Sequence, residues 1–302
     1  MIGYLWRDQL DATELGHVEE LLAVAVAEDA EAGFSTATPA APGRGAVRHL
    51  LVTIAAAGQR GSSALDALPD VPVVAYLRLD THDGIGDAQL VVRPEFRSHG
   101  IATLLAELLD EQPDGGAAVP GLRTLRAWAH GAHPAADRMA QRFGATMEHG
   151  VFRTIRLIGG SRPFDAPAVA VTATETAEGT RELVDGHHDV LAPEQRAVLA
   201  RGRVRLSLAS GSDGGAVLVG ADLERPATVP ACIAIQTDPG SREALRDLLT
   251  AALLQVQGEG ARVAQLYVDA LDEDVVSVSR SLGFEHDQSD YVYLRDIPAR
   301  KA

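Results

Sequence analysis

Hydrophobic and polar positions in the first half of the chain follow two kinds of pattern. Apolar residues at helical spacing over 13–30 and an apolar stretch over 100–109 predict two helices. Short apolar runs, alternating in places with polar residues, predict strands at 50–54, 71–79 and 87–93. Helices and strands are interspersed along the chain, which predicts a fold of the α/β (α+β) class.

The pattern of the segment 125–157 recurs in the segment 264–294. Each segment reads as a strand, a turn, a helix of about ten residues, a glycine suited to a helix C-terminus and a final strand. Gly144 aligns with Gly283 at a spacing of 139 residues, and the other elements align at the same spacing. Agreement over several consecutive elements indicates an internal repeat rather than a chance match.

The repeat predicts two related α/β domains in tandem. A turn-rich joint rich in Gly and Pro occupies residues 159–167. We therefore expect an N-terminal domain at 1–158 and a C-terminal domain at 168–302. Each length is comfortable for one hydrophobic core.

Charge and composition narrow the classes of partner. The chain has 27 Lys and Arg against 42 Asp and Glu, a formal net charge of −15. Nucleic-acid binding depends on cationic side chains that neutralise phosphates, so we expect no nucleic-acid partner. No apolar run approaches the length of a transmembrane helix, and the first residues lack the apolar core of a signal peptide. We therefore expect a cytoplasmic protein with no membrane partner.

Cysteine and histidine usage argues against a metal cofactor. Cys232 is the only cysteine, which excludes an internal disulfide and a Cys-rich metal site. We expect it to be a small buried side chain rather than a nucleophile. His187 and His188 are adjacent, and on a strand their side chains would point to opposite faces. We therefore expect no metal.

The loop between the strand at 87–93 and the helix at 100–109 carries the strongest chemical signal. It reads Arg-x-x-Gly-x-Ala from Arg97 to Ala102. Gly100 lets the backbone approach a ligand, and unpaired N–H groups at the start of the helix favour phosphate oxygens. Arg97 adds a cationic contact. An ordinary strand-to-helix turn can also contain these residue types, so the loop alone leaves both roles open.

This loop, the strand around Trp128, the helix that ends at Gly144 and the final strand together resemble the GCN5-related N-acetyltransferase (GNAT) family. The resemblance covers residues 87–157. In that family the corresponding loop holds the pyrophosphate of acetyl-CoA, so the resemblance implies acetyl-CoA as cosubstrate. It implies two tandem GNAT-like domains, each with a mixed, mostly antiparallel central sheet flanked by helices. The implied cofactor contacts are Leu90, Val91, Val92, Arg97, Ser98, His99, Gly100, Ile101, Ala102 and Thr103.

The tandem arrangement resembles more narrowly the mycothiol synthase family. That family acetylates the cysteinyl amine of cysteinyl-glucosaminyl-inositol, so the resemblance implies a small-molecule amine as substrate. Tyr267 and Asp269 match the family pattern in residue type and are the implied substrate-binding residues. The stretches that carry this resemblance are 49–52, 90–94, 127–131, 266–268 and 281–284.

In that family the C-terminal half carries the reaction, and here this half departs from the pattern. Where a second cofactor loop is expected, Gly240 comes too early and the carboxylate of Glu243 would repel a pyrophosphate. The carboxylate expected on the preceding strand is Ala231, and the tyrosine expected on the last helix is Ser279. The acidic residue expected in the first-half substrate loop is Thr36.

These departures leave the catalytic groups unknown and three hypotheses open. The chain is an acetyltransferase of the mycothiol synthase type, an acetyltransferase for another small amine that uses the N-terminal site, or a catalytically decayed acetyl-CoA-binding protein. The two halves can pack against each other, so a monomer is the simplest expectation. The histidines that could replace a lost general base are His130, His133, His149, His187, His188 and His286.

Overall fold

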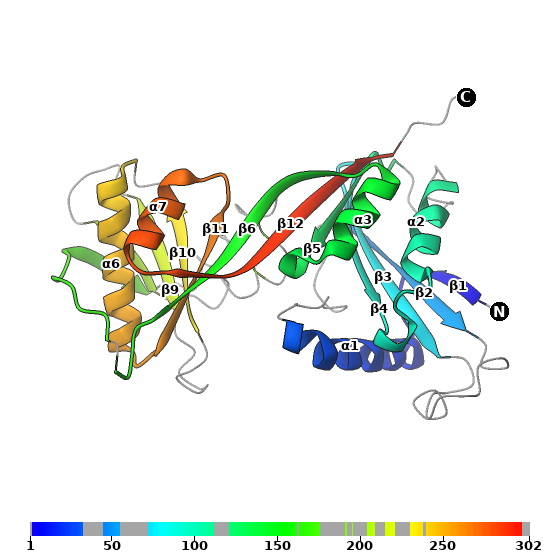
Figure 1. Cartoon of the computed structure of the whole chain (residues 1–302), viewed down its shortest axis with the longest axis horizontal. Coiled ribbons are helices and arrows are strands. Elements are labelled where there is room, and N and C mark those ends of the chain that lie inside the picture. Colours follow the sequence, from blue (N-terminus) through cyan, green and yellow to red (C-terminus); the bar gives the residue numbers. More distant parts are fainter. Residues whose placement is uncertain are drawn as a thin grey trace. The chain divides into compact units, whose positions relative to one another are not determined.

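The chain folds into two compact units, seen in a computed structural model (Figure 1). Unit 1 comprises Met1–Glu148 together with Tyr291–Ala302, and unit 2 comprises His149–Asp290. The structure describes residues 2–32, 45–54, 72–111, 121–161, 163–175, 191, 195, 204–208, 215–220, 230–237 and 240–297. Thr36, His187 and His188 lie outside the described residues.

The sheet of unit 1 has the strand order β1-β2-β3-β4-β5-β12. Neighbouring strands are antiparallel except β4 and β5, which are parallel. Its elements are β1 (Ile2–Arg7), α1 (Ala12–Ala32), β2 (Ala46–Ile54), β3 (Val73–His82), β4 (Ile85–Val92), α2 (Ile101–Glu111), β5 (Thr124–Ala129), α3 (Pro134–Phe143) and the later part of β12 (Glu285–Asp296). Short 3-10 turns at Pro94–Phe96 and His130–Ala132 follow β4 and β5.

The sheet of unit 2 has the order β6-β11-β10-β9-β8-β7, and β10 and β11 are its parallel pair. The other neighbours printed for this sheet are antiparallel. Its elements are β6 (Thr146–Leu157), β7 (Val171–Glu175), β8 (Val204–Leu208), β9 (Ala216–Gly220), β10 (Ala231–Thr237), α6 (Arg242–Gly258), β11 (Val263–Asp269) and α7 (Glu273–Ser281). A mixed, mostly antiparallel sheet flanked by helices in each unit confirms the expected fold class.

The last strand of each sequence repeat pairs within the unit built mainly from the other repeat. In unit 1, Tyr291 on β12 pairs with Ala129 on β5. In unit 2, Phe152 on β6 pairs with Val268 on β11. Tyr291 lies 139 positions after Phe152, and Val268 lies 139 positions after Ala129. The register of the last strands therefore keeps the spacing of the sequence repeat. The boundaries of the compact units thus differ from those expected from the sequence, 1–158 and 168–302. β6 belongs to unit 2 and the later part of β12 to unit 1, because the last strands of the two repeats are equivalent and either can complete either sheet.

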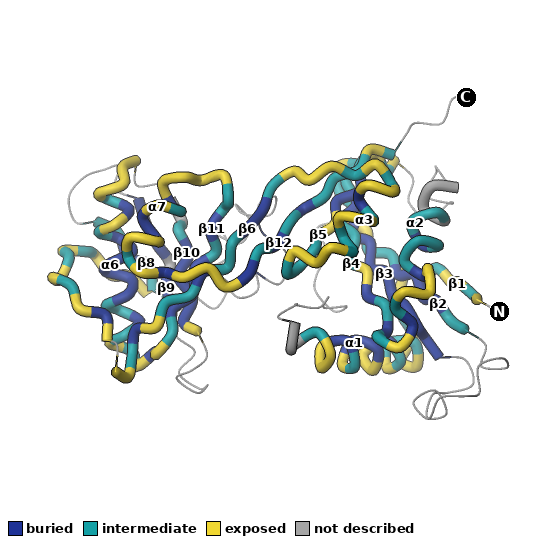
Figure 2. The backbone as a smooth tube through the Cα atoms, in the orientation of Figure 1, coloured by how far each residue is buried: buried dark blue, intermediate teal, exposed yellow. Residues whose placement is uncertain are grey.

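Two helices cover the two faces of the unit 1 sheet, as expected from strands that are apolar on both sides. α1 packs against the side chains of Leu51, Tyr76 and Val91, on what we call the α1 face. α2 packs against the opposite α2 face through Ile101 and Leu105. Figure 2 shows the buried central strands, and every residue of β3 from Val73 to Asp80 is buried. Burial on both faces accounts for the long apolar run that predicts this strand.

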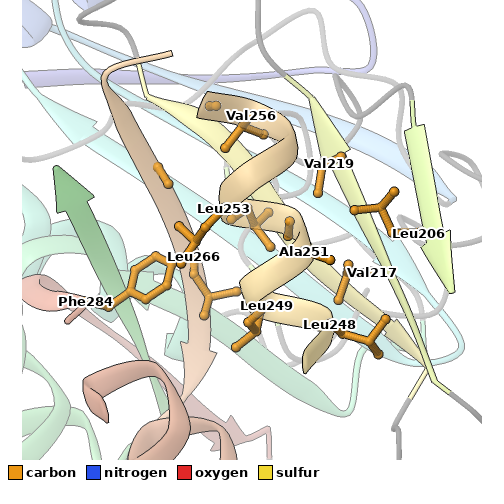
Figure 3. Packing of buried hydrophobic residues seen from close by; sticks show 14 of the residues in the cluster. Leu206, Val217, Val219, Leu248, Leu249, Ala251, Leu253, Val256, Leu266 and Phe284 are labelled. Atoms are coloured by element: carbon orange, nitrogen blue, oxygen red, sulfur yellow. The ribbon is translucent and has the colours of Figure 1, made fainter. Parts of the chain in front are cut away.

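The core of unit 2 is built around α6. Its apolar residues recur at three and four positions and pack on the sheet together with Leu266 and Phe284 (Figure 3). Burying one leucine side chain of this kind contributes about 1.5–3 kcal/mol. The buried apolar residues of α6 are Leu245, Leu248, Leu249, Ala251, Ala252, Leu253 and Val256.

The predicted elements of unit 1 agree with the structure, and the omissions have local explanations. The helix predicted at 13–30 is α1, and the helix at 100–109 is α2. β1 was missed because a six-residue edge strand with four exposed or half-exposed apolar positions gives no alternating pattern. α6 is not among the predicted elements, because its first residues occupy the place where a second cofactor loop is expected. Among the helices within the described residues, none has the length and apolar content to cross a membrane.

Candidate functional site

The parallel pairing of β4 with β5 stops before β4 ends. The paired residues run from Ile85 with Thr124 to Ala88 with Ala127. β4 continues to Val92 and stays paired with β3 over that length. We call the place where β4 and β5 cease to pair the fork of unit 1. Beyond it, β4 presents a backbone edge that β5 does not use.

The direction of the backbone groups along this edge follows from strand alternation. The N–H of Arg93 donates to the carbonyl of Val74 on the β3 side at 2.8 Å. Alternation then turns the backbone groups of Leu90 and Val92 toward the fork. The carbonyl of Val92 accepts from Nε of Arg97 at 3.1 Å. Leu90 therefore offers its N–H and carbonyl to a ligand that lies along β4.

The side chains of these residues divide between the two faces of the sheet. Val91 is buried on the α1 face, and Val92 packs half-buried on the α2 face. Leu90 shares the α2 face by alternation, yet its side chain remains 39% exposed. An exposed apolar side chain beside an unused backbone edge suits a ligand with amide groups on an apolar chain.

The loop that follows β4 is shaped by left-handed residues. Phe96 is buried and anchors the 3-10 turn, after which Ser98 has φ of 64° and Gly100 has φ of 78°. A Cβ added at Gly100 would meet no atom within 4 Å, so the backbone angle rather than crowding favours glycine there. Nδ1 of His99 contacts the carbonyl of Arg97 at 2.8 Å. The loop residues from Arg97 to Gly100 therefore lie directly before the first turn of α2.

The first turn of α2 has backbone donors that the helix itself does not use. Its first internal bond runs from the N–H of Leu104 to the carbonyl of Gly100 at 2.9 Å. The N–H groups of Ile101, Ala102 and Thr103 precede that bond and have no acceptor within the helix. The first turn contains no acidic residue. Together with the helix dipole, these N–H groups favour a bound anion.

The guanidinium group of Arg97 pairs with a carboxylate of α1, whereas the sequence predicts that it contacts a bound anion. Its Nη1 and Nη2 donate to the two carboxylate oxygens of Asp29 on α1 at 2.6 and 2.9 Å. The guanidinium thus ties the loop to α1, and its charge is matched by a carboxylate. Arg93 is similarly paired with Glu20 at 3.2 Å. An anion at this loop would therefore be held mainly by backbone N–H groups, without the cationic contact from Arg97 that the sequence predicts.

Unit 2 has a fork of the same kind with a different helix start. The pairing of β10 with β11 ends at Ile233 and Leu266, although β10 continues further. At the start of α6, Oγ of Ser241 accepts from the N–H of Ala244 at 3.2 Å. Glu243 places a carboxylate in the first turn. The cap and the carboxylate both disfavour an anion at this helix.

The positions that replace expected catalytic groups in unit 2 are part of its core. Ala231 and Ser279 are buried, 1% and 2% exposed. The hydroxyl of Ser279 donates to the carbonyl of Val276 at 3.0 Å, within its own helix. Neither residue offers a group for proton transfer. Cys232 is buried, as the sequence predicts.

Tyr267 and Asp269 lie on the same strand but have separate environments. Burial raises the pKa of Tyr267, so its hydroxyl stays protonated over the physiological range. Oδ1 of Asp269 accepts from the N–H of Leu271 at 2.9 Å and shapes the turn after β11.

The candidate histidines within the described residues mostly have structural partners. Nδ1 of His133 accepts from the N–H of Ala135 at 3.1 Å and caps α3. Nε2 of His286 lies 2.8 Å from Oγ of Ser289. In the described part of the chain, no group of three or more His, Cys, Asp or Glu side chains is arranged to hold a metal ion.

The α1 face beside the fork of unit 1 carries a polar row that the sequence reading missed. His49 on β2, Arg78 on β3 and Gln89 on β4 are direct register partners. Nδ1 of His49 lies 2.7 Å from the hydroxyl of Tyr76. Burial, aided by the charge of Arg78, lowers the pKa of His49, and burial raises the pKa of Tyr76 to about 12. A period-two alternation of polar residues with the apolar core of β3 and β4 is the signal that could have revealed this row.

The charges next to this row are balanced in pairs. Arg126 on β5 forms two hydrogen bonds with Asp87 on β4, one of them from Nη2 at 3.0 Å. Arg78 lies 3.8 Å from Asp80. Oε1 of Gln89 is buried and, within the part of the chain that the structure describes, has no hydrogen-bond partner.

Several known proteins that are similar to this chain are named as acetyltransferases. No protein-family model matches the chain. Mycothiol acetyltransferase of Actinosynnema mirum is 28% identical over 97% of this chain and 99% of its own. The enzymes of the same name from Saccharomonospora viridis and Frankia casuarinae are 32% and 30% identical over 48% and 58% of this chain. Those two matches cover 42% and 55% of the length of the two enzymes, so this chain spans about half of each of them.

Solved structures share the fold of the whole chain. A tandem GNAT protein from the clavulanic acid biosynthesis pathway superposes with a TM-score of 0.61, at 16% identity, over 100% of both chains. A GCN5-related N-acetyltransferase from Sphaerobacter thermophilus gives a TM-score of 0.57 at 15% identity, over 98% of this chain and 96% of that one. At these identities the similarity establishes the tandem GNAT fold.

Proposed function

We propose that this chain, which has the tandem GNAT fold and resembles mycothiol acetyltransferase in sequence, is an acetyl-CoA-dependent N-acetyltransferase with its cofactor site in unit 1. The observation that carries the proposal is the combination of an open fork with the uncapped first turn of α2. Unit 2 has a fork but lacks the second feature, since Ser241 caps α6.

Within this proposal, acetyl-CoA lies along the unused edge of β4. The pantetheine arm follows Leu90, Val91 and Val92, and the pyrophosphate is held by backbone N–H groups between Ser98 and Thr103. Arg97 positions the loop through Asp29 rather than meeting the phosphates directly. The chain contributes fixed backbone donors where charge is held or develops, so these donors need little reorganisation during the reaction.

The reaction that fits this site is direct acyl transfer. A neutral amine attacks the thioester carbonyl carbon, a C–N bond forms, the C–S bond breaks, and the thiolate of CoA takes up the proton released by the amine. The N–H of Leu90 faces the fork and is the donor we assign to the developing oxyanion. The transfer needs no metal within this scheme.

The acceptor that we propose is the cysteinyl amine of cysteinyl-glucosaminyl-inositol, whose acetylation yields mycothiol. Similarity to mycothiol acetyltransferases along almost the whole chain supports this choice. The substrate contacts implied for Tyr267 and Asp269 lie in unit 2 and belong to the alternative in which unit 2 carries the transfer. A second candidate is another small amine acetylated in unit 1, which is favoured by the loss of reactive groups at Ala231 and Ser279.

Calorimetric titration with acetyl-CoA tests the location of the cofactor. Gly100→Glu places a side chain at a left-handed position and a carboxylate at the anion site, so we expect a loss of affinity of at least a hundredfold. Gly240→Glu is the matched control, because Gly240 also has a left-handed φ, of 71°, and no atom near an added Cβ. We expect its affinity to equal that of the unchanged protein. The reverse pattern would place the cofactor in unit 2.

Mass spectrometry of the reaction products tests the acceptor. The protein with acetyl-CoA and the cysteinyl amine should give the acetylated product, and Gly100→Glu should abolish it. A better rate with another primary amine would favour the second candidate. Binding of acetyl-CoA without turnover of any amine would indicate a decayed enzyme.

A further inference from the structure

Gln89 lies at the fork of unit 1 and has an amide oxygen that no group among the described residues satisfies. It is the first residue of β4 after the pairing with β5 ends at Ala88. Its side chain lies on the α1 face, since it alternates along the strand with Leu90 and shares a face with Val91. Oε1 is buried and lacks a hydrogen-bond donor. Buried polar atoms are nearly always satisfied, so a missing partner calls for an explanation.

The charged side chains around Gln89 do not explain its unused oxygen. Arg78 is its register partner on β3 and lies 3.8 Å from Asp80. Arg126 on β5 is engaged by both carboxylate oxygens of Asp87. Both guanidinium groups therefore have carboxylate partners, and the local charge is balanced.

The opposite side of the fork is aromatic. Trp128 follows Ala127 on β5, so it corresponds to Gln89 when the parallel register is continued past Ala88. It shares a face with Arg126 by alternation, and therefore lies on the α1 face as well. An amide oxygen on one side and an indole ring on the other suit a ligand that carries N–H donors or an ammonium group.

The corresponding positions of unit 2 do not repeat this arrangement. After the last paired residue of β10, Ile233, the chain has Ala234. Tyr267 takes the place of Trp128 at the repeat spacing. The amide at the fork thus occurs in the unit whose helix start is open to the pyrophosphate.

We propose that Gln89 binds the acceptor amine, with Oε1 accepting an N–H of the substrate on the α1 face of the fork. This inference rests on the proposed function and assigns the transfer step to unit 1. Gln89 orients the nitrogen lone pair toward the thioester carbon. It takes no proton, because a neutral amide is not a base; the proton passes to the departing thiolate.

Steady-state kinetics with acetyl-CoA and the cysteinyl amine test this assignment. Gln89→Leu removes the oxygen at similar volume, so we expect the KM for the amine to rise about tenfold, as for loss of one hydrogen bond to the substrate. The calorimetric Kd for acetyl-CoA should stay unchanged. Gln89→Glu keeps an acceptor oxygen and should restore the KM to within about threefold. Gln89→Met keeps the length of the side chain without the oxygen and should raise the KM as Gln89→Leu does, whereas a packing role would let Met restore it.

A matched control comes from unit 2. Gln288 is 7% exposed and also has a buried Oε1 without a partner, while its Nε2 donates to Asp290 at 2.7 Å. We expect Gln288→Leu to leave the KM for the amine unchanged. An increase with Gln288→Leu but not with Gln89→Leu would overturn the assignment and place the acceptor in unit 2.

Two further outcomes separate this inference from the proposed function. If the unchanged protein binds no acetyl-CoA, the proposed function fails and the inference fails with it. If it binds acetyl-CoA but acetylates neither the cysteinyl amine nor another primary amine, the cofactor site stands and the role of Gln89 is overturned. An equal KM in Gln89→Leu and the unchanged protein overturns it as well.

Discussion

The two units place the same topology around two chemically different helix starts. In each, a parallel strand pair separates and a helix begins just after the strand that continues. At α2 the backbone donors of the first turn are unused, whereas at α6 Ser241 supplies an acceptor and Glu243 adds a negative charge. The comparison shows that two units of one chain can share a fold and still differ in their capacity to bind an anion. A few side chains at the N-terminus of a helix decide whether an anion can bind there.

Loss of the pairing between Arg97 and Asp29 should have the largest of the three effects, a change in the affinity of unit 1 for acetyl-CoA. We expect Asp29→Ala to weaken acetyl-CoA binding about tenfold, because the loop loses a bidentate tether of charge-assisted hydrogen bonds. Arg97→Ala should weaken it to the same extent. Calorimetric titration of both variants measures the effect.

The two variants would diverge if Arg97 contacts the phosphates itself. Asp29→Ala would then free the guanidinium and tighten binding, while Arg97→Ala would weaken it. Glu107→Ala is a suitable control, since Glu107 pairs with Arg142 on the exposed side of α2. Its affinity for acetyl-CoA should equal that of the unchanged protein.

Removal of the N-cap of α6 tests the helix start of unit 2, and we expect an effect of intermediate size on stability. Ser241→Ala deletes the acceptor for the N–H of Ala244 and should reduce the free energy of unfolding by about 1 kcal/mol. Urea denaturation measures the loss, and Ser161→Ala, at an exposed turn, serves as a control. We expect no second acetyl-CoA site in the calorimetric titration, because Glu243 remains. A second site would mean that the cap alone distinguishes the two helix starts.

The smallest effect concerns the polar row in unit 1. The pKa of His49 is lowered below 6.5 in the folded protein, so the unfolded chain binds the proton more readily. The stabilisation is complete above pH 6.5 and is lost as the pH falls from 6.5 toward the folded value. Thermal unfolding of His49→Gln between pH 5 and pH 7, to be compared with that of the unchanged protein, should show a weaker dependence on pH. His286→Gln, at an exposed position of unit 2, is the control for loss of a histidine outside the polar row.

Much of the fold and part of the site were accessible from the sequence. The helices α1 and α2, the central strands of unit 1 and the repeat at 139 residues follow from hydrophobic periodicity and turn residues. The loop from Arg97 to Ala102 was identified because its residue types have local backbone consequences. The cofactor and substrate contacts implied for these residues remain predictions.

The rest depended on groups that are distant along the chain. Arg97 pairs with Asp29 at a separation of 68 residues, and no local pattern indicates that partner. The polar row of His49, Arg78 and Gln89 becomes visible only when three strands are set in register. Side chains on β strands alternate between faces, so a shift of one residue would have placed these groups on the other side.

The sequence by itself determined the secondary-structure elements, the tandem repeat and the loop that starts α2, because local periodicity, turn chemistry and helix capping act over a few residues. Only the tertiary structure decided which last strand completes which sheet, where the guanidinium of Arg97 is held and which oxygen at the fork lacks a donor. Those outcomes depend on strand pairing and burial between segments far apart in sequence, and neither is encoded in a short stretch of residues.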